Sequence, residues 1–126
     1  MTSMKWYLVK MVYQVVSGNG NHTPQFDEQF RMIKADELDW AWEKANVLGA
    51  LGECNFLNYH RKEVKWIFIA VTDIQEIKSI EDGMQLFGRT EEPDDVEEYI
   101  TLTKARSEHM MAYAKNSDHF MQTSAN

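Results

Sequence analysis

The chain has 126 residues, with 20 acidic and 13 basic side chains and a formal net charge of −7. This length suits one domain with a sizeable core. The net charge argues against a general nucleic-acid binder, whose affinity rests on Lys and Arg contacts to phosphates. No stretch approaches the roughly 18 continuous apolar residues of a membrane span. We therefore expect a protein that binds neither nucleic acid nor membranes.

The single cysteine, Cys54, excludes an internal disulfide and fits a reducing compartment. The first residues run directly into a strand pattern, which leaves no room for a signal peptide. We therefore expect a cytoplasmic protein. Residues 1–126 should form a single α+β domain, of which residues 91–126 are a C-terminal helical extension.

Two segments, Trp6–Val16 and Val64–Thr72, are too apolar for half-exposed strands. In the first, the odd-numbered residues from 7 to 15 make a wholly apolar face, and the other face is interrupted only by Lys10 and Gln14. In the second, the pattern sets Val64, Trp66, Phe68 and Ala70 against Ile67, Ile69 and Val71. Strands that are apolar on both faces belong in the middle of a sheet that is covered on both sides.

A loop and a more polar strand follow the first apolar strand. Ser17–Pro24 is rich in Gly, Asn, Ser and Thr, and we expect Ser17–Gln25 to be mobile. Phe26–Lys34 alternates, with Asp27, Gln29 and Arg31 on one face. One polar face is typical of an edge strand.

A helical period begins after Ala35, with Asp36 as the predicted N-cap. The helix should end near Gly49 or Gly52. Trp42 lies on the apolar stripe and is expected in the core. Trp40 lies about 160° away and should be off the core face, either as a contact surface or beneath another segment. The stripe consists of Leu38, Ala41, Trp42, Ala45, Leu48 and Gly52.

The second half of the chain predicts two more strands and a helix. Cys54–His60 is expected to be a connector, and the strand that begins at Val64 to run to about Asp73, with Ile74–Ile77 extending it or forming a bend. Met84–Arg89 is predicted as a short fourth strand. Asp94, with Glu97 three residues later, predicts the start of the last helix. Its apolar stripe holds Val96, Tyr99, Ile100, Thr103, Ser107, Met110, Met111 and Ala114.

The predicted fold class is α+β, with ββαββα topology and two helices. Following the direction of the chain, the four strands form a wholly antiparallel sheet. If the four predicted strands are numbered along the chain, their order in the sheet is 2-1-3-4, which places the two most apolar strands in the centre.

Three segments of this pattern resemble a known family: Lys5-Trp6-Tyr7-Leu8-Val9-Lys10, Phe68-Ile69-Ala70-Val71-Thr72-Asp73-Ile74-Gln75-Glu76-Ile77 and Gly83-Met84-Gln85-Leu86-Phe87. The chain resembles, over about residues 4–90, the uncharacterised bacterial family catalogued as domain of unknown function 4288. The resemblance implies a small cytoplasmic bacterial protein. The family brings no activity that could be assigned to a residue of this chain.

Few side chains suggest chemistry, and we predict no catalytic, cofactor-binding or metal-binding residue and no cofactor. Cys54 and His60 are the only candidate nucleophile and base, but Cys54 follows a helix C-terminus, where the dipole disfavours a thiolate; we interpret it as a buried thiol in a turn. The four histidines, His22, His60, His109 and His119, lack ligand spacing. The acidic run over residues 91–98 is interpreted as a solvated helix start rather than a site for a basic partner.

The leading functional hypothesis is a non-enzymatic protein-interaction or homo-oligomeric domain, with a homodimer as the expected assembly and a further protein partner as a possibility. The last helix should not fully cover the second sheet face, which a second copy would close. The alternative is a small-molecule-binding or enzymatic domain with an aromatic-lined pocket, favoured if His60 and Asp73 converge on a cavity. The predicted interaction surface is Trp6, Leu8, Val12, Trp40, Met110 and Met111.

Overall fold

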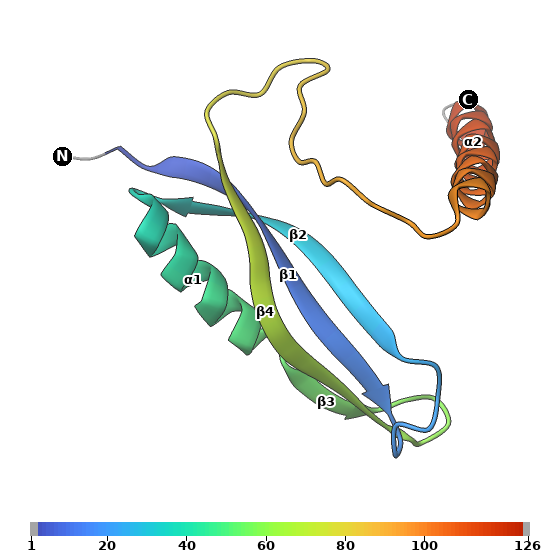
Figure 1. Cartoon of the computed structure of the whole chain (residues 1–126), viewed down its shortest axis with the longest axis horizontal. Helices are drawn as coiled ribbons and strands as arrows, with labels where there is room; N and C mark the ends of the chain where they lie inside the picture. The colour runs from blue at the N-terminus through green and yellow to red at the C-terminus, as the bar shows by residue number, and fades with distance from the viewer. Residues whose placement is uncertain (1–2, 125–126) are drawn as a thin grey trace. The chain divides into compact units, whose positions relative to one another are not determined.

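The computed structural model describes the backbone of residues 3–124 and the side chains of residues 3–117. The chain divides into two compact units, Met1–Phe87 and Gly88–Asn126. The first unit holds a sheet and one helix, and the second holds one long helix (Figure 1). In chain order the elements are β1 Lys5–Ser17, β2 Gln25–Ala35, α1 Leu38–Leu51, β3 Cys54–Leu57, β4 Glu63–Ile77 and α2 Val96–Ser124.

The four strands form one antiparallel sheet in the spatial order β2-β1-β4-β3. The predicted pairing of the two most apolar segments is confirmed, since β1 pairs with β4 from Trp6 opposite Ile77 to Ser17 opposite Val64. β2 lies at an edge, as its polar face predicted. The α+β class, the ββαββα topology and the two helices are therefore confirmed.

The identity of the fourth strand was predicted wrongly. Residues 84–89 form no strand, and Cys54–Leu57, expected to be a connector, is the strand β3 that pairs with β4. A tight turn makes this hairpin: Asn58 Oδ1 accepts hydrogen bonds from the backbone N–H groups of His60 and Lys62. Four exposed residues carry no alternation, so the strand left no pattern in the sequence.

β4 contains two bulges. Ile69 and Thr72 each lie between two paired residues of β4 and face no residue of β1. The first bulge moves Val71 onto the same face as Phe68, where it lies opposite Met11 in the core. The prediction that Val71 lies on the other face is therefore wrong. Each bulge also increases the local twist, consistent with the curled sheet in Figure 1.

α1 packs on one face of the sheet through small side chains. Ala41, Ala45 and Gly49 are buried and recur every four residues, so the helix backbone lies close to the strands. Trp42 is consequently displaced to the rim of the helix and is 43% exposed, which corrects its predicted place in the core. The core of this layer consists of Tyr7, Val9, Met11, Tyr13, Ile33, Ala35, Ala41, Ala45 and Val71.

The starts of α1 and α2 differ by one residue from the prediction, and the predicted end of α1 at Gly52 is confirmed. The N-cap of α1 is Glu37 rather than Asp36, and Gly52 is its C-cap. At α2, Asp95 Oδ1 accepts a hydrogen bond of 3.0 Å from the backbone N–H of Glu98, so Asp95 takes the capping role expected of Asp94. Among the described residues, no helix combines the length and the apolar character that crossing a membrane requires.

Candidate interaction surface

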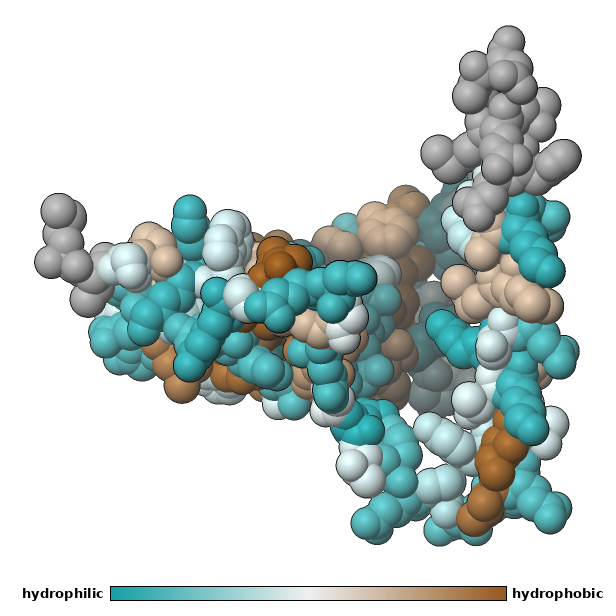
Figure 2. Space-filling view, turned by 90° about the horizontal axis from the view of Figure 1, so that it is seen from above, coloured by the Kyte–Doolittle hydropathy of each residue, from teal (hydrophilic) through white to brown (hydrophobic). Residues whose placement is uncertain are grey.

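The sheet face opposite α1, here called the open face, has no helix over it within the first unit. Trp6, Leu8 and Val12 of β1 lie on it, and their cross-strand partners Met32 and Glu28 on β2 share it. The space-filling view shows hydrophobic side chains reaching the surface between hydrophilic ones (Figure 2). The exposed hydrophobic side chains of the open face are Trp6, Phe26, Phe30, Met32, Ile67 and Ile69.

Three large apolar side chains of β2 point away from α1, whereas Ile33 and Ala35 are buried in the core. Phe26, Phe30 and Met32 are 60%, 51% and 44% exposed. On the α1 side of β2, Gln29 Nε2 donates to Asp27 Oδ2 at 2.7 Å and Arg31 donates through two nitrogens to Gln29 Oε1, whereas Glu28 and Lys34 lie on the open face. This ladder satisfies the polar groups within the strand and leaves the aromatic groups at the surface.

A lysine is buried in the middle of the open face. The Lys10 side chain is only 7% exposed, and its Nζ lies 3.0 Å from Glu28 Oε1. The rings of Phe30 and Phe87 flank it, with centroids 5.9 and 6.0 Å from Nζ. The two rings meet edge to face at 5.1 Å. An aliphatic stem between aromatic rings with a paired ammonium group is a low-cost way to bury a lysine.

Phe87 belongs to the segment after β4, which returns over one end of the open face. Its hydrogen bonds are local, such as that from Met84 N–H to the carbonyl oxygen of Glu81. Between this segment and the sheet lies an open groove of about 380 Å³, whose lining includes Trp6, Met32 and Ile80. The open face is therefore partly covered by one irregular segment and is otherwise exposed.

The predicted interaction residues belong to three different elements, β1, α1 and α2. Trp6, Leu8 and Val12 come together on the open face, although Leu8 is buried there. Trp40 is exposed, as expected from its angle on the helix, and lies on α1 at the opposite layer. Met110 and Met111 are exposed on α2, in the second unit.

Five residues that dominate this surface were not predicted to belong to it: Phe26, Phe30, Met32, Lys10 and Phe87. The alternation of Phe26, Phe30 and Met32 with polar residues was visible. Which of the two faces would meet α1 was not, because that depends on the register with β1.

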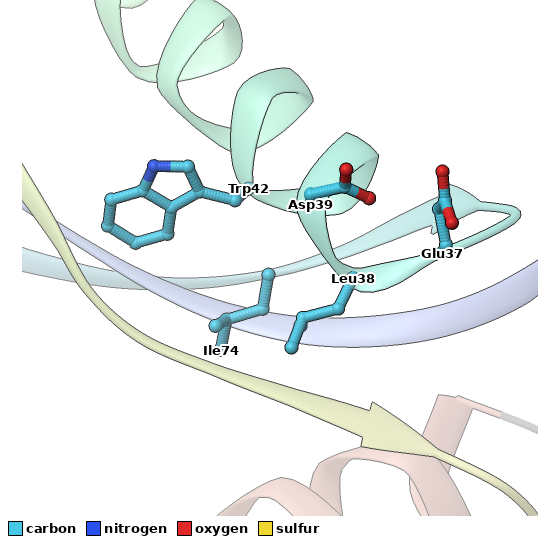
Figure 3. Close-up of a pocket in the computed structure, with 5 residues that line it drawn as sticks. All are labelled: Glu37, Leu38, Asp39, Trp42 and Ile74. Carbon is cyan, nitrogen blue, oxygen red and sulfur yellow. The ribbon is translucent and has the colours of Figure 1, made fainter.

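A second candidate site is a groove of about 680 Å³ beside the first turn of α1 (Figure 3). Trp42, Leu38 and Ile74 form its apolar wall, and the carboxylates of Glu37 and Asp39 lie at its rim. His60 and Asp73 do not converge on it. Asp73 lies ten residue steps beyond Glu63 on β4, about 33 Å at the rise of a strand, and His60 lies in the turn before Glu63.

Cys54 and the histidines His22 and His60 make local contacts that do not form a catalytic or metal-binding group. Cys54 is exposed on β3, which corrects the expectation of a buried thiol in a turn. His60 packs its ring edge to face against Tyr59. His22 accepts a hydrogen bond from the Ser17 N–H at Nε2, and its Nδ1 lies 2.8 Å from the carbonyl oxygen of Thr23. In the part of the chain that the structure describes, no three His, Cys, Asp or Glu side chains gather as metal ligands; His119 lies outside the described side chains.

Among the described side chains, two have a shifted pKa, and both shifts arise from their immediate neighbours. Burial raises the pKa of Tyr13, whose hydroxyl donates to the carbonyl oxygen of Gly49 under α1. The hydrogen bond from Asn55, together with Lys65, holds the pKa of Glu63 below its usual range. Both effects have local structural causes.

The comparisons with known proteins identify a family. No curated protein and no solved structure matches the chain. A protein-family model, described as domain of unknown function (DUF4288), matches residues 6–88, a range that spans nearly the whole of the first compact unit. The match covers more than half of the sequence, and the chain therefore belongs to the DUF4288 family.

Proposed function

We propose that the protein is a non-enzymatic interaction domain that functions as a homodimer in the cytoplasm. The observation that carries the proposal is the open face, where Phe26, Phe30 and Met32 point away from the core. Soluble monomers rarely expose contiguous aromatic patches of this kind, which mark interaction sites. The net charge of −7 favours a protein partner over a nucleic acid, and an exposed free thiol at Cys54 fits a reducing compartment.

The second unit supports the same proposal. In the described part of that unit α2 is the only helix, and Tyr99, Ile100, Met110 and Met111 have no second helix or strand there to pack against. A second copy would supply a matching helix, and the flexible methionine side chains adapt well to such a contact.

Sedimentation equilibrium at 1–50 µM tests the proposal. We expect a particle of twice the monomer mass of 14.8 kDa. Replacing Phe30 and Met32 together by Gln should weaken the dimer at least tenfold, because truncating buried apolar contacts at an interface removes binding energy. Leu51→Gln, which replaces an exposed apolar side chain at the end of α1, serves as the control. A chain that stays at 14.8 kDa throughout this range contradicts the proposal.

The second candidate function is small-molecule binding in the groove beside Trp42. It is supported by the indole and two aliphatic side chains that wall the groove. A fragment screen by ligand-observed NMR tests it. Competition lost in Trp42→Ala but kept in Trp40→Ala supports a binding site, and binding that is equal in both variants argues against it.

A further inference from the structure

We infer that two copies of this chain join along the free edge of β2, antiparallel about a two-fold axis, so that their two sheets become continuous. This inference rests on the proposed self-association and specifies its contact. Across the described residues, β2 pairs only with β1, so one side of its backbone lacks a strand partner. Such an edge is a template for a further strand.

The edge of β2 is unusually regular. Its pairing with β1 runs without a bulge from Val15 opposite Gln25 to Lys5 opposite Ala35, and it contains no proline. All 11 residues have strand geometry, and alternate residues direct their backbone N–H and C=O groups to the free edge. A regular edge of this length can hold a full antiparallel partner.

The edge of β4 on the other side of the sheet is blunted. Beyond Trp66, β4 has no strand on its outer side, but it carries the bulges at Ile69 and Thr72. The backbone N–H of Phe68 on this edge is already bonded to Glu53 Oε2 at 3.1 Å. Bulges and side-chain caps are the usual means of preventing edge pairing. β2 has no bulge, and the side-chain bond to its backbone, from Lys44 Nζ to the carbonyl oxygen of Lys34 at 3.0 Å, lies at its C-terminal end.

The charges of β2 select the partner and its direction. Asp27 and Glu28 occupy the first half of the strand, and Arg31 and Lys34 the second half. When the strand pairs antiparallel with its own copy, each acidic half lies beside a basic half. Parallel pairing would set like charges together, which is destabilising. The strand is therefore complementary to itself in one direction only.

The exposed apolar side chains of β2 also favour antiparallel pairing with a second copy. Phe26, Phe30 and Met32 lie on the open face of the edge strand itself. Residues opposite one another on antiparallel strands have Cβ atoms about 5 Å apart, so these side chains would pack against those of the second copy. Ile67 and Ile69, on the far side of the same face, would lie outside the contact.

A charge exchange tests the inference. The double variant Arg31→Glu/Lys34→Glu has an acidic β2. The double variant Asp27→Lys/Gln29→Lys has a basic β2 and keeps Glu28, the partner of Lys10. Each variant alone should dimerise at least tenfold more weakly than the natural chain because like charges oppose. An equimolar mixture should form a heterodimer, which native mass spectrometry detects by its mass and which also shows that both variants are folded.

The matched control is Arg61→Glu/Lys62→Glu, which changes the net charge by the same amount as the acidic variant and lies in the turn between β3 and β4, at the edge of the sheet opposite β2. We expect it to dimerise like the natural chain. If both β2 variants also do so, the edge inference is wrong while self-association stands. If neither variant dimerises and the mixture does not restore pairing, the charge complementarity is wrong. A natural chain that is monomeric contradicts the proposed function itself.

Hydrogen exchange of the unmodified chain gives an independent readout. Raising the concentration from 1 to 100 µM should slow the exchange of amides in β2 and leave those of residues 67–77 unchanged. Slowing that is confined to β4 would overturn the inference, whatever the variants do.

Discussion

The hydroxyl of Tyr13 donates a hydrogen bond of 2.7 Å to the carbonyl oxygen of Gly49. This bond joins the central strand to the last turn of α1. The Tyr13 ring is fully buried and packs against Trp66 and Phe68, at centroid distances of 6.0 and 5.6 Å. One polar contact inside an aromatic cluster thus sets where the end of the helix lies on the sheet.

Tyr13→Phe should lower the free energy of unfolding by about 0.5–1.5 kcal/mol, the usual net value of one hydrogen bond. The loss should stay in this range because Gly49 O also accepts a hydrogen bond from the Gly52 N–H. Urea unfolding at pH 7 measures it. Tyr59→Phe, at an exposed tyrosine, is the control and should change nothing.

Stability should also fall at alkaline pH. Burial raises the pKa of Tyr13 above its ordinary value of 10.0, so the folded chain retains this proton longer than the unfolded chain. The stabilisation from this group is complete below pH 10 and is lost as the pH rises through the folded pKa. Tyr13→Phe should show a shallower decline than the natural chain above pH 10. Equal slopes would contradict the assignment.

Gly49→Ala should destabilise the protein, although alanine is the better helix former by about 1 kcal/mol. A methyl group at Gly49 would overlap the ring of Phe68, which cannot move freely beside Tyr13. We expect a net loss of about 1–3 kcal/mol, typical of overpacking. Val47→Ala, at an exposed position of the same helix, should be neutral or slightly stabilising. Thermal unfolding compares the two.

Substitutions in the pair formed by the buried Lys10 and the half-exposed Glu28 should affect stability unequally. Lys10→Met fills the same space without a charge, and stability should be unchanged or slightly increased. Glu28→Ala leaves the buried ammonium group without its carboxylate and should cost about 1–3 kcal/mol. The double change should resemble Lys10→Met alone. Urea unfolding of the three variants measures these free energies. Equal losses of stability in Lys10→Met and Glu28→Ala would contradict the prediction.

Cys54 should behave as an ordinary exposed thiol. It lies on β3, away from a helix N-terminus. We expect reaction with a thiol reagent at pH 7 at the rate of a free cysteine peptide, and unchanged dimerisation in Cys54→Ser. A reaction many times faster than the peptide would indicate an activated nucleophile.

The methionines of α2 should contribute to dimerisation. Met110→Gln/Met111→Gln should raise the dissociation constant of the dimer about tenfold, equivalent to about 1.4 kcal/mol. Ala105→Gln/Ala112→Gln places the same side chains on the opposite side of the helix, at 100° per residue, and is the control. Similar dissociation constants in the two double variants would show that the methionine side of α2 does not contribute to the dimer.

Much of the sheet followed from apolar periodicity. The two strands with apolar residues on both faces lie in the centre, and the strand with a polar face lies at the edge, as predicted. These patterns are long, and each is read from many residues. β3 was missed because four exposed residues carry no periodicity, and the turn at Asn58 that makes it a hairpin depends on side-chain hydrogen bonds.

The interaction surface could be predicted only in part. Trp6 and Val12 were placed on a shared face and lie together. Trp42 was assigned to the core from its angle on the helix, but the closeness that Ala41 and Ala45 permit displaces the larger ring to the side. Such displacement depends on the distance between two layers, which no local pattern encodes.

The bulges of β4 determine where a single residue can be deleted without changing the pairing of the sheet. Ile69 and Thr72 face no residue of β1, so losing either one shortens β4 while every other pair keeps its partner. Losing Ile74 instead would shift the residues beyond it by one and turn each side chain to the other face. Single-codon deletions should therefore be accepted at the two bulges and rejected a few codons later, which makes this strand a place where length can evolve without a change of fold.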